Sequence, residues 1–337
     1  SNLLTSEGGS YSEFGVVLNS QPTNTVEVCL TSTDTGEGIV DIANSDAIAT
    51  VGCGGDAQLT FTTGNWNAPQ TVRITGQDDL LQDGNIAYTL QITTNSSDGA
   101  YNAVNPPDLS FTNVDDDTVG ITVSAGSNLL TSENGGYSEF GVVLNSQPTN
   151  TVEVCLTSTD TGEGIVDIAN SDAVATVGCG GDAQLTFTTG NWNVVQTVRV
   201  TGQSDLLQDG DIAYTLQITT NSTDGAYNAV NPPDLSFTNI DDDTVGITVS
   251  AGSNLLTSEG GDYSEFAVVL NSQPTNTVEV CLTSTDTGEG IVDIANSDAV
   301  ATVGCGGDAQ LTFTTGNWNA AQTVRITGQG DLLQDGN

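Results

Sequence analysis

The residues of this sequence that could do chemistry are carboxylates, and they gather in a few short segments. In residues 119–244 the segments are Glu133 in TSENGG, the stretch 160–182, the loop GQSDLLQDGD and the run DDD at 241–243. Carboxylates packed closely repel one another unless a cation lies between them. Hard divalent cations with about six to eight oxygen ligands fit such groups, and calcium tolerates irregular geometry best. The acids therefore predict cation sites, with calcium as the expected ion.

The charge balance excludes several classes of function. Of 337 residues, 43 are Asp or Glu and three are Arg, and Lys, His and Met are absent, so the formal net charge is -40. Binding of nucleic acid is excluded and binding to anionic membranes is not expected, because both need basic residues. We also expect no enzyme, since the chain has no His and no Ser in a GxSxG motif. A pair of carboxylates could hydrolyse glycosides in principle, but an active site repeated in every unit would be unusual.

An internal repeat sets the organisation of the chain. Trp66, Trp192 and Trp318 are 126 residues apart, and the Cys and Arg residues keep the same step. Such a period is too long for one turn of a solenoid and is typical of an independent domain. We predict three domains, which we call the first repeat (1–118, without its first strand), the second repeat (119–244, complete) and the third repeat (245–337, without its last two strands).

Within a period the pattern is one of short alternating strands separated by turn residues. In the second repeat the predicted strands are 119–124, 138–144, 152–157, 183–188, 197–201, 212–220 and 235–240. No segment has a sustained helical period. Seven such strands in about 120 residues predict an all-β chain, a tandem array of seven-stranded antiparallel sandwiches of immunoglobulin-like type. The link DDDTVGITVS contains no flexible spacer, so the repeats are expected to stack end to end.

Both ends of the sequence fall inside a predicted sandwich. Residue 1 follows the first strand of its repeat, and Asn337 precedes the sixth strand of the last one. We expect the sequence to be a segment of a longer tandem array. The alternative is that neighbouring chains donate the missing strands.

The six Cys residues fall two per repeat, 24 residues apart, and form no CxxC pair. A zinc site is not expected without His. One disulfide within each repeat is the economical interpretation, and six free thiols are the alternative. Disulfides would place the protein in an oxidising, extracellular setting. The predicted pairs are Cys29 with Cys53, Cys155 with Cys179, and Cys281 with Cys305.

The topology of an up-and-down sandwich brings the acids together. The loops after strands one, three and five lie at the same end of the sandwich as the exit from strand seven, and these four segments hold most of the loop acids. Because the run 241–243 leads directly into the next repeat, this acidic pole is also the junction between repeats. The alternative is that acids in turns are merely solvated.

Three stretches resemble the Calx-beta domain, as it recurs in large secreted bacterial repeat proteins. They are TSEGG before strand two, LTFTTGNWNAPQTVRITGQDD across strands four and five, and NVDDD at the end of the repeat. The resemblance implies calcium held by a Glu after strand one, by acids of the loop between strands five and six, and by the terminal Asp run. The chain departs from the family in two places: the Cys-containing insertion replaces an acidic segment after strand three, and Asp83-Gly84 stands where the family has Asp-Glu.

These arguments give the predicted calcium ligands. They are Glu7, Asp79, Asp83, Asp115, Asp116 and Asp117 in the first repeat, Glu133, Asp205, Asp209, Asp241, Asp242 and Asp243 in the second, and Glu259, Asp331 and Asp335 in the third. Asp78 aligns with Ser204 and Gly330, so that position is not required.

The expected function is structural: a calcium-stiffened extracellular array that forms a surface filament, a matrix fibre or an adhesin stalk. Its expected partners are further copies of the same repeat or chain. The alternative is a binding module that recognises a glycan or another surface through the repeats, for example through Trp66 and nearby aromatic residues. More often such aromatic residues cover a sandwich core.

Overall fold

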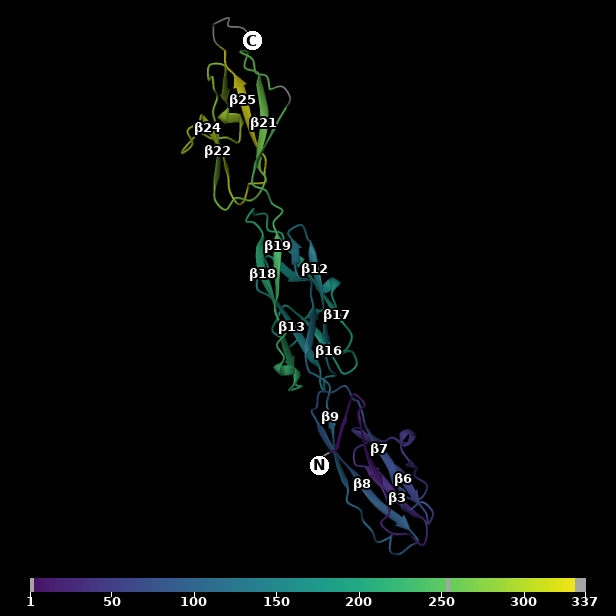
Figure 1. Cartoon of the computed structure of the whole chain (residues 1–337). Helices are drawn as coiled ribbons and strands as arrows, with labels where there is room; N and C mark the ends of the chain where they lie inside the picture. Colours follow the sequence, from purple (N-terminus) through teal and green to yellow (C-terminus); the bar gives the residue numbers. More distant parts are fainter. Residues whose placement is uncertain (1–2, 253–254, 331–337) are drawn as a thin grey trace.

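The computed structural model of the chain describes residues 3–252 and 255–330. It is nearly all strand, which confirms the predicted all-β class, and its only helices in the described residues are short 3-10 turns. Figure 1 shows three groups of strands that follow one another along an elongated molecule. No helix of the described residues is long and apolar enough to cross a membrane.

The second repeat consists of two sheets. One sheet has the strand order β11-β19-β18-β13-β16-β15, and the other has the order β10-β12-β17-β14. The strands are β10 (Ile121–Ser124), β11 (Leu129–Ser132), β12 (Tyr137–Leu144), β13 (Val152–Ser158), β14 (Gly164–Val166), β15 (Val174–Ala175), β16 (Ala183–Phe187), β17 (Gln196–Gly202), β18 (Ile212–Ser222) and β19 (Leu235–Ile240).

All seven strands predicted in the second repeat are present, and three short ones are added. The additions are β11, β14 and β15, each of two to four residues. Runs of this length are too short to show an alternating pattern, so the sequence carries no signal for them. The sheets are also not purely antiparallel, because β11 pairs parallel with β19.

The core of the second repeat lies between its two sheets. Phe140 and Val142 of β12 are 2% and 0% exposed, and they alternate with more exposed residues of the same strand. Tyr214 and Phe237 stack within this core with ring centroids 5.4 Å apart. Trp192 packs against the same cluster, so this tryptophan covers the core as expected.

The described residues of the first repeat form the same strands except for a counterpart of β10. Its sheets have the orders β1-β9-β8-β3-β6-β5 and β2-β7-β4. The strands are β1 (Leu3–Ser6), β2 (Tyr11–Val16), β3 (Val26–Ser32), β4 (Gly38–Val40), β5 (Ile48–Ala49), β6 (Ala57–Phe61), β7 (Gln70–Gly76), β8 (Ile86–Ser96) and β9 (Leu109–Val114).

The described part of the third repeat forms a four-stranded sheet, β20-β21-β25-β23, and a two-stranded sheet, β22-β24. Its strands are β20 (Ile247–Ala251), β21 (Tyr263–Leu270), β22 (Val278–Leu282), β23 (Gly290–Val292), β24 (Ala309–Phe313) and β25 (Gln322–Gly328). Short 3-10 turns interrupt the insertions and one loop of the chain: η1 (Ile42–Asn44), η2 (Ile168–Asn170), η3 (Tyr227–Ala229) and η4 (Ile294–Asn296).

Each repeat carries one disulfide, with the pairing predicted from the spacing. The Cys29–Cys53, Cys155–Cys179 and Cys281–Cys305 bridges have Cα–Cα distances of 5.5, 5.5 and 5.6 Å. Each bridge ties the long insertion after the third sandwich strand to that strand. The insertion is thereby held on the sheet near the edge strand β5 or β15.

Candidate metal centre

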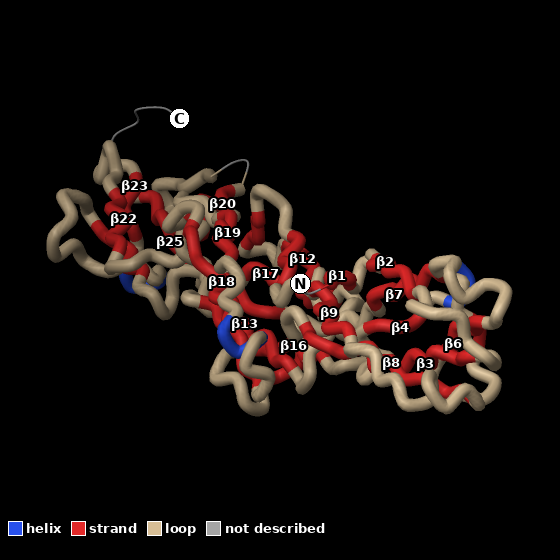
Figure 2. The backbone as a smooth tube through the Cα atoms, turned by 60° about the horizontal axis from the view of Figure 1, so that its bottom comes forward, coloured by secondary structure: helices blue, strands red, loops and turns tan. Residues whose placement is uncertain are grey.

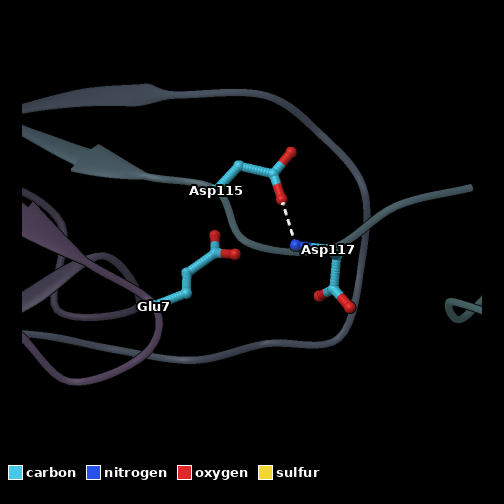
Figure 3. A group of neighbouring side chains, drawn as sticks. All are labelled: Glu7, Asp115 and Asp117. Carbon is cyan, nitrogen blue, oxygen red and sulfur yellow. Dashed lines mark hydrogen bonds between the residues drawn. The ribbon is translucent and has the colours of Figure 1, made fainter.

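The acidic pole of the first repeat contains a compact group of carboxylates, which we call the Glu7 cluster. It consists of Glu7, Asp115 and Asp117, and one ligand oxygen from each lies within 4.8 Å of the others. Glu7 follows β1, while the two Asp residues follow β9. In Figure 3 the Glu7 side chain extends from one chain segment toward the loop that carries Asp115 and Asp117.

Backbone pairing places the Glu7 cluster. β1 runs parallel to β9 from Leu3 opposite Phe111 to Ser6 opposite Val114, and the Glu7 amide continues the ladder with a bond of 3.1 Å to the Val114 carbonyl. The chain therefore leaves both strands at the same level. Turn bonds then set the terminal Asp run: the Asp115 carboxylate accepts from the Asp117 amide at 2.8 Å and from the Gly84 amide at 2.7 Å.

The electrostatics of this cluster favour an added cation. Glu7 is only 3% exposed, and its burial among other carboxylates raises its pKa to about 7, against one hydrogen bond from the Asp116 amide. Burial first, and then neighbouring carboxylates, also raise the pKa of Asp117. A bound cation would stabilise the ionised carboxylates and so offset both the cost of their burial and their mutual repulsion.

A second group at the same pole includes a residue that was not among the predicted ligands. Glu37 joins the predicted Asp79 and Asp83, again with one oxygen from each within 4.8 Å of the others, and we call this the Glu37 cluster. Glu37 directly precedes β4 and accepts a hydrogen bond from Asn113 at 3.2 Å. Burial and the neighbouring acids raise the pKa of Glu37 and Asp83.

A glycine explains how Glu37 reaches the cluster. A Cβ atom on Gly38 would overlap the Tyr88 side chain, so only glycine allows β4 to approach this ring. The Tyr88 hydroxyl in turn bonds to the Thr5 hydroxyl at 3.1 Å, just before Glu7. The same packing therefore brings both clusters to one pole. In the sequence, the available signal was an acid immediately before this glycine, in the stretch TGEGIV.

The second repeat reproduces both groups. The Glu133 cluster contains Glu133, Asp241 and Asp243, and the Glu163 cluster contains Glu163, Asp205 and Asp209.

At the acidic poles of the first and second repeats, some buried carboxylate oxygens accept no hydrogen bond, which also fits a bound cation. Glu133 is 5% exposed, and burial raises its pKa to about 7. Within the described residues, three buried carboxylate oxygens at these poles accept no hydrogen bond. They are Asp117 Oδ2, Glu133 Oε2 and Asp243 Oδ2. Buried oxygens of this kind are costly unless they gain a partner, which a bound cation would provide.

The middle residue of the Asp run differs between the repeats. Asp116 lies with Asp78 and Asp117 in a third group of the first repeat. Ser204 replaces Asp78 in the second repeat, and Asp242 joins no such group there within the described residues. In the third repeat Glu259 is exposed, while the predicted ligands Asp331 and Asp335 lie outside the described residues.

Most acids of the Cys-bridged insertion do not join the clusters, although the topology predicted that this insertion would be at the acidic pole. Of its acids in the second repeat, only Glu163 belongs to one of the groups. Asp167 bonds to the side chain of Asn170 at 2.8 Å, and Asp172 accepts from the Thr197 amide at 2.6 Å. These carboxylates therefore support the local backbone and the turn η2.

The loop that carries Asp79 also contacts the next repeat. The Asp79 carboxylate accepts from the Leu81 amide at 2.7 Å, and Leu80 between them has a positive φ of 85°. In this conformation the Leu80 carbonyl accepts a hydrogen bond of 2.8 Å from the Gln147 amide of the second repeat. Leu206, with φ of 80°, makes the same 2.8 Å bond to the Gln273 amide of the third repeat. An unfavourable conformation for Leu is thus retained at both junctions.

No protein-family model matches the chain, and no curated protein sequence matches it. Solved structures give weak similarities. Calcium binding domain CBD12 of CALX1.1 is 19% identical, with a TM-score of 0.28 over 65% of this chain and 78% of that one. CBD12 from CALX1.2 is 17% identical, with a TM-score of 0.24 over 64% of this chain and 76% of that one.

A third similar structure is the adhesin CfaE of enterotoxigenic E. coli. It is 10% identical, with a TM-score of 0.30 over 72% of this chain and 97% of that one. At these identities and TM-scores, the similarities assign no ligand and no function to this chain.

Proposed function

We propose that the protein is a calcium-stiffened structural array of the cell exterior, in which the acidic poles bind calcium at the junctions between repeats. The observation that carries the proposal is the location of the Glu7 and Glu37 clusters. Asp115 and Asp117 of the Glu7 cluster lie on the link to the next repeat. Asp79 and Asp83 of the Glu37 cluster lie in the loop between β7 and β8, in which Leu80 bonds to Gln147 beyond the junction.

The donor set suits calcium. Opposite oxygen ligands of a calcium ion lie about 5 Å apart, since each Ca–O distance is about 2.3–2.6 Å. The oxygens of each cluster lie within 4.8 Å of one another, and all are carboxylates. In the first repeat, Glu7, Asp115 and Asp117 would hold one ion and Glu37, Asp79 and Asp83 another. The bound ion supplies positive charge that offsets the repulsion among these acids.

The chain's own residues transmit this effect to the junction. Asp79 is a member of the Glu37 cluster and also fixes the turn at Leu80. Asp115 and Asp117 begin the link that becomes β10 of the second repeat. Calcium bound at these carboxylates would therefore restrict both the loop and the link. The disulfides favour an oxidising, extracellular compartment, where calcium is available.

Calcium titration with shape measurement tests this proposal. We expect calcium to raise the melting temperature and to reduce the range of repeat orientations in small-angle X-ray scattering. The variant Glu133→Gln should weaken binding in the second repeat and lower the calcium-dependent gain in melting temperature. The matched control Asp167→Asn removes one charge outside the clusters and should bind calcium like the original protein. Identical melting and scattering in EDTA and in calcium would contradict the proposal.

A further inference from the structure

A buried side-chain amide, that of Asn113, makes hydrogen bonds close to both carboxylate clusters of the first repeat. Asn113 is in β9 and is only 1% exposed. Its Oδ1 atom accepts a hydrogen bond from the Thr5 hydroxyl at 3.0 Å. Its Nδ2 atom donates to the Gln77 carbonyl at 2.9 Å and to the Glu37 carboxylate at 3.2 Å. One amide therefore connects β9 with three other segments of the chain.

The four segments that this amide connects carry every member of both clusters. They are the segment after β1 with Glu7, the segment before β4 with Glu37, the loop after β7 with Asp79 and Asp83, and the segment after β9 with Asp115 and Asp117. Figure 2 shows the strands that adjoin these segments, with β1 beside β9 and β4 beside β7. A displacement of the amide would therefore displace ligand-bearing segments of both clusters.

The surroundings hold this amide in one orientation. The Gln77 carbonyl can only accept a hydrogen bond, so the Nδ2 atom must face it and the Oδ1 atom must face the Thr5 hydroxyl. A Cβ atom on Gly76 would overlap Asn113 Oδ1, so glycine is needed for this close packing. The Tyr88 hydroxyl also contacts the Thr5 hydroxyl, at 3.1 Å. Both ends of the amide are therefore hydrogen-bonded in one fixed arrangement.

The second repeat contains the same arrangement. Asn239 is 1% exposed and accepts a hydrogen bond from the Thr131 hydroxyl at 3.0 Å. It donates to the Gln203 carbonyl at 2.9 Å and to the Glu163 carboxylate at 3.2 Å. Glu133, in the segment that follows Thr131, is 5% exposed, and its Oε2 atom has no hydrogen-bond partner. A buried carboxylate oxygen without a partner independently indicates a ligand at this pole.

We propose that this amide couples the two calcium sites of a pole, so that the two ions bind cooperatively; the inference rests on the proposed function, since both clusters have to bind calcium. An ion in the Glu163 cluster restrains Glu163 and, through their hydrogen bond, Asn239. Asn239 in turn restrains Thr131 and the segment that leads to Glu133. The second ion then meets a cluster that is already ordered, so its binding costs less conformational entropy. Asn239 belongs to neither cluster and acts as a positioning residue.

Charge provides a second connection between the clusters, and the experiments have to separate it from the amide. Burial raises the pKa of Glu7, and the carboxylates of Asp79 and Asp83 in the other cluster add to this effect. Loss of a carboxylate from one cluster therefore changes the electrostatic field at the other without any movement of the amide. Two bound ions would also repel each other, which opposes cooperative binding. Salt screens these charge interactions, whereas it does not screen the neutral hydrogen bond between the amide and the Thr hydroxyl.

Hydrogen exchange of the full chain during a calcium titration measures the two clusters separately. Residues 129–136 report on the Glu133 cluster and residues 203–211 on the Glu163 cluster, and both segments differ in sequence from their counterparts in the other repeats. We expect the two segments to become protected at the same calcium concentration. Glu163→Gln should raise the concentration that protects residues 129–136 by about fivefold or more. Glu133→Gln should raise that for residues 203–211 by a similar factor, because coupling is reciprocal.

The second experiment removes the proposed connection without altering a carboxylate. Thr131→Val keeps the shape of the side chain but removes the hydroxyl that donates to Asn239. Calcium should still protect both segments, and Glu163→Gln should no longer shift the titration of the other cluster. Thr131→Ser retains the hydroxyl and should retain the shift. The matched control Thr220→Val removes a hydroxyl that donates to the Val230 carbonyl at 2.6 Å, near the far end of β18, and should leave the coupling unchanged.

The outcomes separate this inference from the calcium proposal. Absence of calcium-dependent protection in both segments would overturn both. Protection of one segment only, or of both without a response to Glu163→Gln, would overturn the coupling alone. A shift that persists in Thr131→Val, or that disappears in about 1 M salt, would assign the coupling to charge and overturn the role of the amide. If Thr131→Val did not fold, the salt dependence of the shift caused by Glu163→Gln would decide the same question.

Discussion

The first and second repeats are almost the same sequence, yet corresponding side chains are buried differently in them. The two differ at ten of 126 aligned positions, and none of the ten is at the positions of Phe14, Val16 or Tyr101. Phe14 is nevertheless only partly buried, while Phe140 is 2% exposed. The difference comes from β10, which has no described counterpart beside β2. Burial at this face is therefore decided by a neighbouring strand and not by the residue itself.

The acidic poles of the same two repeats do not show this difference. Glu7 and Glu133 are 3% and 5% exposed, and each lies with two Asp residues of the following run. All members of each cluster come from segments within one repeat. Each of these two repeats thus completes its own carboxylate clusters. At the apolar edge they differ, because β10 covers β12 in the second repeat and no described strand covers β2 in the first.

The largest expected effect tests the contrast in burial. Phe140→Ala should destabilise the second repeat by about 3–5 kcal/mol, because it leaves a cavity in a closed core. Phe14→Ala should cost the first repeat about half as much, since that side chain is only partly buried. Hydrogen exchange followed by mass spectrometry reports each repeat separately, because TSEGGSY and TSENGGY distinguish the peptides. The measurement uses a concentration at which the protein is monomeric.

The controls for this comparison are Leu130→Ala and Leu4→Ala, which change side chains that are 50% and 58% exposed. Both should leave exchange within the two cores unchanged. Equal losses for Phe140→Ala and Phe14→Ala would contradict the view that β10 determines burial at this face.

The next largest expected effect is the pH dependence of stability that arises at the acidic poles, and it should be the same in the first and second repeats. Burial raises the pKa of Glu7 and Glu133 from 4.5 to about 7, so in the metal-free protein each carboxyl favours folding when protonated. This stability is fully present below pH 4.5, the pKa of the unfolded chain, and is lost as the pH rises to about 7. The loss amounts to about 3 kcal/mol for each group. Calcium should reverse it, because the cation binds the ionised form.

Urea unfolding in EDTA at pH 5 and pH 8 measures this dependence. Asp98 and Asp224 have pKa values below the ordinary Asp value, so they are ionised at both pH values and add no slope of their own. Glu133→Gln should reduce the pH dependence of the second repeat, in which Glu163, Asp209 and Asp243 also have raised pKa values, and should leave that of the first repeat unchanged. A metal-free protein that is more stable at pH 8 than at pH 5 would refute the assignment.

The disulfides provide a third comparison, in which both repeats should again respond alike. Cys155 and Cys179 close a loop of the same length as Cys29 and Cys53. Replacing either pair by Ala should cost about 3 kcal/mol in its own repeat, because the unfolded chain gains freedom. Hydrogen exchange of the insertion in each repeat measures the change. Unchanged exchange in both variants would show that the insertion is held by its backbone pairing alone.

The sequence predicted the long elements of this fold because their pattern is local. Alternation along residues such as Phe140, Val142 and Leu144 is enough to indicate a strand with one buried face. It also predicted that Glu7, Asp115 and Asp117 would meet, because the topology brings the loop after the first strand to the exit from the last. That a cation lies among them remains a prediction.

The features that the sequence did not predict depend on packing between distant segments. Glu37 reaches its cluster because Gly38 lets β4 pack on Tyr88, and no short-range pattern encodes that contact. The positive φ of Leu80 has no sequence signal either, since Leu is a poor residue for that conformation.

The smallest expected effect is at the single Arg of each repeat, where the two repeats have the same geometry. Arg73 bonds to Glu13 at 2.7 Å and Arg199 to Glu139 at 2.8 Å, and each guanidinium lies 3.8 Å from the centre of a Tyr ring. These pairs are partly exposed, so Arg73→Gln or Arg199→Gln should cost less than about 1 kcal/mol. Salt should reduce the cost, because exposed ion pairs are screened.

Unfolding of the two variants in low and high salt decides whether these pairs are only surface contacts. Arg73 lies on β7, directly beside the edge strand β2, and Arg199 lies on β17 in a sheet that β10 extends. If the open edge weakened its neighbours, Arg73→Gln would cost more than Arg199→Gln. Equal small losses of unfolding free energy would show instead that the uncovered edge of β2 does not weaken contacts on the next strand, β7.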